Sequence, residues 1–115
     1  MGAMTEPAEI PQISVTSLPD DAVILDIREQ DEWDRGHAPN AIHIPSGQLA
    51  DRLADLPDVG GTLAISCRSG GRATRATTWL LAQGYDVANL TGGMRAWLAE
   101  GKTMESATDA PPEVP

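Results

Sequence analysis

ISCRSGGRA, residues 65–73, joins a short apolar run to a glycine-containing turn and then to the start of a helix. The run that enters it, Thr62–Ser66, is typical of a buried strand. Cys67 therefore follows the carboxyl end of a strand, which is the edge of a parallel sheet where ligands bind. The helix start beyond it offers unpaired backbone N–H groups and the positive end of the helix dipole. The stretch predicts an anion-binding loop around a thiol.

Strands and helices alternate on both sides of this loop. Apolar runs predict further strands at residues 22–25, 42–44 and 86–90. Strands separated by short helices form right-handed crossover units. We therefore expect the α/β class, with a mostly parallel central sheet flanked by helices on both faces.

Three helices are expected around these strands. Leucines spaced at i, i+4 and i+7 predict a short amphipathic helix that is capped by Ser46 and ended by Pro57. Helical spacing predicts a second helix over residues 72–83, which Gly84 ends, and a third over residues 93–100.

Length and composition fit one domain. The chain has 115 residues, of which 41% are hydrophobic, enough for one core and too few for two domains. We expect the domain at residues 13–101, between flexible tails at 1–12 and 102–115 that lack apolar periodicity. Residues 1–4, MGAM, resemble a leader added for expression. Without an apolar run of roughly 18 residues or a secretory signal, we expect a cytoplasmic protein with no membrane partner.

Charge is unevenly placed along the chain. The formal net charge of -9 argues against a nucleic-acid partner, because phosphate binding requires a basic face. Yet three of the eight basic residues, Arg68, Arg72 and Arg75, follow closely after Cys67. An acidic protein with one local cationic cluster predicts a small anionic ligand.

Cys67 is the only cysteine, and two interpretations compete for it. Free cysteines are often small core residues. A thiol beside arginines and a helix start is instead expected to ionise readily and to act as a nucleophile. A purely structural thiol needs neither the glycines nor the arginines, so the nucleophile is favoured.

Three motifs in order carry a resemblance to a known family. They are LDIRE at 25–29 with Glu32-Trp33 and GHAPNA at 36–41, then CRSGGR at 67–72, and finally LTGGM at 90–94 with Trp97. Together they cover nearly all of residues 13–101, and the chain resembles the single-domain rhodanese-like (thiosulfate sulfurtransferase) family. Two positions depart from the family's pattern. Ala73 stands where relatives often have serine, which removes a hydroxyl donor near the loop, and Ala38 replaces the more usual isoleucine.

The resemblance implies sulfur transfer through a Cys67 persulfide. The thiolate would take the outer sulfur of a small anionic donor such as thiosulfate, and a thiol or cyanide acceptor would then remove it. The backbone N–H groups of Ser69, Gly70 and Gly71 would hold the persulfide, and Arg68 and Arg72 would bind the sulfonate. No cofactor or metal is implied. The alternative is a persulfide carrier or binding module that delivers sulfur to a partner protein.

Loop length argues against a rival enzyme class. Phosphatases and arsenate reductases of related folds place five residues between cysteine and arginine, whereas Cys67 and Arg72 enclose only four. A reductase would also need a second cysteine to resolve its intermediate.

The first motif is expected to support the loop. We assign Asp26 and Arg28 to an internal ion pair at a neighbouring strand end, in preference to catalysis. His37 is expected to cap or bridge a connection, and the three tryptophans are expected to supply core bulk.

Overall fold

The computed structural model describes residues 10–115. This part of the chain contains a single five-stranded sheet. Every strand pair is parallel, and the order is β1-β5-β4-β2-β3. The strands are β1 (Gln12–Ile13), β2 (Leu25–Asp26), β3 (Ile42–His43), β4 (Leu63–Ser66) and β5 (Val87–Leu90). This arrangement confirms the predicted α/β class and parallel sheet.

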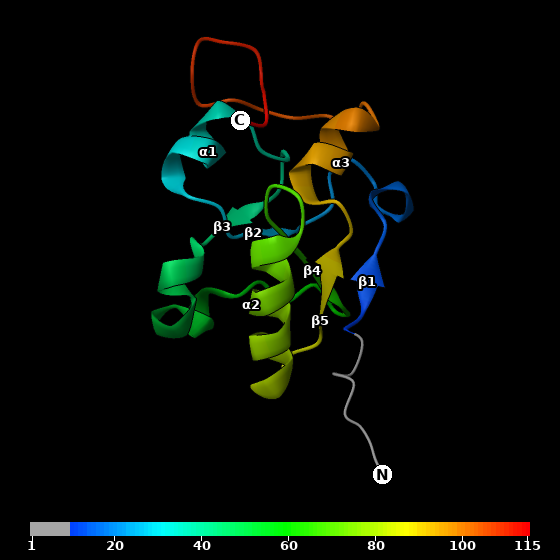
Figure 1. The fold of residues 1–115 in the computed structure, drawn as a ribbon, viewed down its shortest axis with the longest axis vertical. Coiled ribbons are helices and arrows are strands. Elements are labelled where there is room, and N and C mark those ends of the chain that lie inside the picture. Colours follow the sequence, from blue (N-terminus) through cyan, green and yellow to red (C-terminus); the bar gives the residue numbers. More distant parts are fainter. Residues whose placement is uncertain (1–9) are drawn as a thin grey trace.

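Helices cover both faces of the sheet (Figure 1). The α-helices are α1 (Gln30–Arg35), α2 (Gly71–Ala82) and α3 (Gly93–Ala99), and the 3-10 helices are η1 (Val15–Ser17), η2 (Ser46–Asp51) and η3 (Leu53–Asp55). One apolar cluster joins α2 and η2 to the sheet, and a second joins α3 and η1 to the opposite face. Among residues 10–115, no helix is long and apolar enough to cross a membrane.

The central strand β4 determines the face on which the thiol lies. Leu63 and Ile65 pack into the cluster on the α2 side, whereas Ala64 packs into the opposite cluster. Side chains of a strand alternate between faces with a period of two. Cys67 lies two residues after Ile65, on the same face as Leu63 and Ile65, and it belongs to the apolar cluster on the α2 side. The fold thus places the thiol between the end of β4 and the start of α2.

The predicted amphipathic helix after Ser46 is wrong in type. The segment forms two 3-10 helices, because Arg52 leaves the helical region at φ -123° and ψ 29° and interrupts the hydrogen-bonding pattern. Pro45 occupies the N-cap position, so Ser46 provides no side-chain cap. The leucines still face inward: Leu49 is buried, and the other two are partly buried against the same cluster.

Other elements differ from the expectations at their edges. The strand expected at 22–25 is assigned only from Leu25, although the Ile24 carbonyl still accepts a hydrogen bond of 2.8 Å from the Ile42 N–H. β1 includes Gln12, which we had placed in the first tail, while residues 1–9 of that tail lie outside the described residues. α1 was not predicted, because its sequence QDEWDR has no apolar stripe.

The segment 102–115 returns toward the end of the molecule that carries α1 and α3 (Figure 1). The Trp97 indole N–H donates to the Thr103 carbonyl at 2.9 Å, and His37 and Glu105 form an antiparallel bridge. Farther on, the Glu113 N–H donates to the Arg35 carbonyl at 2.9 Å. The flexibility expected of this segment stays a prediction, but the structure gives it specific contacts with the domain.

The start of α3 packs directly on the backbone of the Cys67 loop. The N–H groups of Met94 and Arg95 donate to the carbonyls of Cys67 and Arg68 at 2.8 and 2.9 Å. Gly93 allows this approach, since a Cβ atom there would lie 2.5 Å from the Cys67 carbonyl oxygen. Its φ of +58° also favours glycine. The glycines of the third motif therefore let α3 hold the loop.

We predict that Gly93→Ala lowers the free energy of unfolding by at least about 2 kcal/mol, because the new methyl group meets rigid backbone in a strained conformation. Urea denaturation followed by circular dichroism measures the change. Gly47→Ala is the matched control, since nothing lies within 4 Å of a Cβ atom there, and its effect should stay below about 1 kcal/mol. Equal stability of the two variants would contradict the packing role of Gly93.

Candidate active site

The Cys67 side chain lies at the carboxyl end of the central strand and is almost fully enclosed, with 1% of the residue exposed. Its sulfur accepts two backbone hydrogen bonds, from the Gly70 N–H at 3.1 Å and from the Ala73 N–H at 3.3 Å. Hydrogen bonds from N–H donors favour a negative charge on the acceptor over a neutral one. The Cys67 sulfur is therefore buried in the core, and the two N–H groups that contact it favour a negatively charged sulfur.

The loop that supplies these donors is held in shape by its own backbone. Gly70 adopts φ +123°, a conformation that side chains disfavour. Its carbonyl accepts from the Thr74 N–H at 2.8 Å and from the Thr74 hydroxyl at 2.7 Å, which ties the turn to the first turn of α2. The Gly70 conformation and the two contacts from Thr74 therefore fix the turn that directs the Gly70 N–H inward.

The structure uses only part of the predicted loop set around the sulfur. Of Ser69, Gly70 and Gly71, only Gly70 donates to it, and both of the others are exposed. The second donor, Ala73, was missing from the predicted site. Its position six residues after Cys67 was the available signal, because the first turn of a helix has unpaired N–H groups.

Arg72 is held by a carboxylate from α1. Its Nη1 and Nη2 atoms lie 2.7 and 2.9 Å from Oε1 and Oε2 of Glu32, a bidentate pair between residues 40 positions apart in sequence. This hydrogen bonding lowers the pKa of Glu32 from 4.5 to about 2 and raises the pKa of Arg72. The positive charge of Arg72 is therefore already paired with the Glu32 carboxylate.

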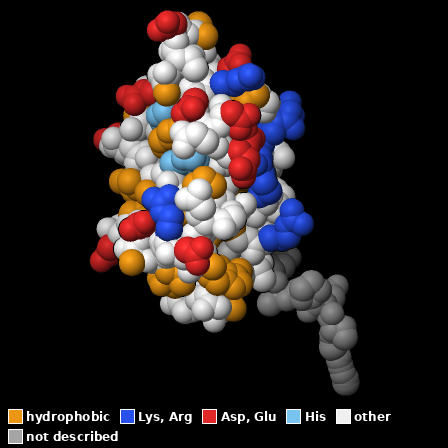
Figure 2. Space-filling view, turned by 90° about the vertical axis from the view of Figure 1, so that its left-hand side faces the viewer, with side chains coloured by type: hydrophobic (Ala, Val, Ile, Leu, Met, Phe, Trp, Pro, Cys, Tyr) orange, Lys and Arg blue, Asp and Glu red, His pale blue; other side chains and the backbone are white. Residues whose placement is uncertain are grey.

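The other two arginines point elsewhere. Arg68 is exposed, and its Nε atom donates to the Pro115 carbonyl at 2.8 Å. Arg75 is exposed on α2. Figure 2 shows several Lys and Arg side chains along one edge of the face in view, next to acidic side chains, and a further basic side chain within the face. Among the described contacts, none of the three predicted arginines donates to the Cys67 sulfur.

Asp26 and Arg28 form a fully buried ion pair beside the loop. The Arg28 Nη2 and Asp26 Oδ2 atoms are 2.7 Å apart, and the Arg28 Nε atom also contacts both carboxylate oxygens. Arg28 Nη2 then donates to the Gly36 carbonyl at 2.6 Å, just beyond α1. The pair connects the end of β2 to the helix that carries Glu32, and neither residue is hydrogen bonded to Cys67.

The two histidines stack with a tryptophan next to this pair. The rings of His37 and His43 lie 3.7 and 4.8 Å from the Trp33 ring and are nearly parallel to it. His37 Nδ1 lies 2.7 Å from the Trp33 carbonyl, which supports the expected bridging role. The tryptophans differ from the expectation: Trp97 is buried core, but Trp79 is 37% exposed.

Among residues 10–115, no three His, Cys, Asp or Glu side chains gather in a group that could hold a metal ion.

A model of the rhodanese-like domain matches residues 14–100. The chain belongs to the rhodanese-like family. A Bacillus subtilis relative provisionally named sulfurtransferase YtwF is 33% identical over 100 residues, covering 82% of this chain and 96% of its own. The thiosulfate sulfurtransferase GlpE of Pseudomonas savastanoi is 31% identical over 98 residues, which cover 84% of this chain and 92% of that protein.

Solved rhodanese structures agree with the fold. A rhodanese-like domain protein from Staphylococcus aureus aligns with a TM-score of 0.72 and 30% identity, covering 86% of this chain and all of that one. Names and fold together support sulfur transfer as the general activity of this rhodanese-like chain.

We predict that the Glu32–Arg72 pair stabilises the fold only above acidic pH. A carboxyl whose folded pKa is about 2 and whose unfolded value is 4.5 stabilises the native state above pH 4.5, and this contribution disappears as the pH falls toward 2. The difference in free energy of unfolding between wild type and Glu32→Gln should therefore shrink between about pH 5 and pH 2. Urea titrations at several pH values measure it. A difference that does not change with pH would contradict an ionised, paired Glu32.

Proposed function

We propose that this protein is a thiosulfate sulfurtransferase-like enzyme that carries sulfur on Cys67. The Cys67 thiolate attacks the outer sulfur of thiosulfate, a new S–S bond forms, and the bond to the sulfonate sulfur breaks with its electron pair leaving on sulfite. The Cys67 persulfide then gives its outer sulfur to a thiophilic acceptor. With cyanide the product is thiocyanate, and the Cys67 thiolate is restored.

The observation that carries this proposal is the pair of N–H groups directed at the Cys67 sulfur. Gly70 and Ala73 donate to it at 3.1 and 3.3 Å in a buried setting. Preorganised donors in a site that excludes water stabilise developing negative charge without reorganisation. They would stabilise the thiolate before attack and, with a small shift of the donors, the anionic outer sulfur of the persulfide.

The arginines give the site its preference for an anionic donor. Arg72 lies at the start of α2, and its side chain is positioned by the bidentate pair with Glu32. Arg68 directly follows the nucleophile and is exposed. We assign both to attraction and binding of the sulfonate. Asp26 and Arg28 are positioning residues in this account, because they act through α1 and Glu32.

We predict thiocyanate formation from thiosulfate and cyanide, with parallel lines in double-reciprocal plots, because the sulfur is held covalently between two half-reactions. Cys67→Ser should lose the activity. A colorimetric assay of thiocyanate as its iron(III) complex measures the rates. Intersecting lines, or activity that survives in Cys67→Ser, would contradict the covalent route.

We predict that Arg68→Ala and Arg72→Ala each lower kcat/KM for thiosulfate by roughly 10- to 150-fold, through loss of one charge-assisted contact. Alkylation by neutral iodoacetamide should slow much less. In Arg72→Ala, the unpaired Glu32 carboxylate could itself repel thiosulfate. The double variant Glu32→Gln/Arg72→Ala removes this repulsion, and it should recover only a minor part of the lost kcat/KM. Equal losses in both assays would show that the arginines activate the thiol instead of selecting the anion.

A further inference from the structure

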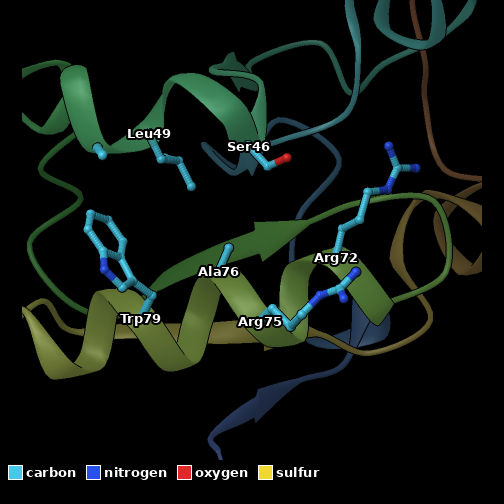
Figure 3. Close-up of a pocket in the computed structure, with 7 residues that line it drawn as sticks. Ser46, Leu49, Arg72, Arg75, Ala76 and Trp79 are labelled. Atoms are coloured by element: carbon cyan, nitrogen blue, oxygen red, sulfur yellow. The ribbon is translucent and has the colours of Figure 1, made fainter.

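A groove lies between η2 and α2, on the face of the sheet that carries Cys67 (Figure 3). Its volume is about 420 Å³, within the range of about 300–1,000 Å³ that is usual for small-molecule sites. The lining residues are Ser46, Leu49, Ala50, Arg72, Arg75, Ala76 and Trp79. Cys67 is not among them, but Arg72 is, so the groove adjoins the proposed sulfur-transfer centre without including the thiol.

The walls of the groove are apolar and include an unusual surface residue. Figure 3 shows Leu49 of η2 and Trp79 of α2 directed toward each other across the groove, with Ala76 between them. Leu49 is buried, whereas Trp79 leaves 37% of its surface in solvent. An indole carries a large apolar surface, and the exposed part of the Trp79 ring forms one flat side of the groove. The wall suits a ring or a short apolar chain.

The charge of the groove is opposite to that of the whole protein. The chain has 17 acidic and 8 basic residues, yet the groove is lined by two arginines and by no acidic residue. α2, GRATRATTWLLA, likewise carries two arginines and no carboxylate. This local inversion favours a ligand with negative charge.

Among residues 10–115, one of the two arginines has a carboxylate partner and the other has none. Figure 3 shows Arg72 extending away from the groove, where it is paired with Glu32. For Arg75, no carboxylate among residues 10–115 lies within salt-bridge distance. Arg75 is exposed and lines the groove, and Figure 3 shows its side chain extending away from Trp79, toward the end of the groove at Arg72. Its guanidinium is therefore available to an anion whose apolar part lies against Trp79.

From these contacts we propose that the groove binds one amphipathic organic anion, with its apolar body between Leu49 and Trp79 and its carboxylate or sulfonate on Arg75. The volume accommodates a small ring system, as in sites for small organic molecules. The proposed ligand contacts neither the Cys67 thiol nor the loop N–H groups, although Arg72 lines the same groove.

Two fluorescent probes with the same rings test the proposal on the full chain. Anilinonaphthalene sulfonate carries the anion, and N-phenylnaphthylamine is its neutral counterpart. We expect Trp79→Ala to weaken both by about 10-fold or more, through lost apolar contact. Arg75→Gln should weaken the sulfonate by about 2- to 5-fold, as expected for an exposed ion pair, and leave the neutral probe unchanged.

Matched variants guard against nonspecific binding and unfolding. Leu98→Ala and Arg95→Gln remove an exposed apolar and an exposed basic side chain from α3, and both should bind the probes like wild type. Ala50→Glu adds bulk and negative charge at an exposed groove position, so it should weaken both probes without touching the core.

Two results would overturn the proposal: binding of the sulfonate that is unchanged in Trp79→Ala and Ala50→Glu, or an equal response of the two probes to Arg75→Gln. Neither result bears on thiocyanate formation by Cys67.

Discussion

Two backbone N–H groups directed at one buried sulfur are the feature on which the rest of the structure depends. They belong to Gly70 and Ala73, and they can converge on Cys67 only because a strand ends and a helix begins around it. Both donors are backbone groups, and only the acceptor, the Cys67 sulfur, belongs to a side chain. The site therefore needs a rigid backbone more than it needs particular polar groups, and much of the chain contributes to that rigidity.

Two separate supports hold the loop from opposite sides. On one side the start of α3 donates to the carbonyls of Cys67 and Arg68, and this approach requires glycine at position 93. On the other side α1 presents Glu32 to Arg72, and the buried pair of Asp26 and Arg28 attaches α1 to the sheet. The first and third sequence motifs thus support the loop formed by the second. This division of roles gives a physical reason for all three motifs.

The sequence predicted the strand, the glycine turn and the helix around Cys67, because they follow one another within nine residues. It could not predict that Arg72 is paired. Glu32 lies 40 positions away, on a short helix without an apolar stripe, so no local pattern indicates the contact. Trp79 was misassigned to the core for a related reason. Helical spacing places it near the apolar face, but the structure leaves 37% of the residue exposed beside the groove between η2 and α2.

The central claim is that the buried sulfur of Cys67 accepts and holds one further sulfur atom. Intact-mass spectrometry of the protein after exposure to thiosulfate and removal of the excess tests it most directly. The account predicts a gain of about 32 Da, the mass of one sulfur atom on the nucleophile, which cyanide then removes. An unchanged mass, or the same gain in Cys67→Ser, would contradict it.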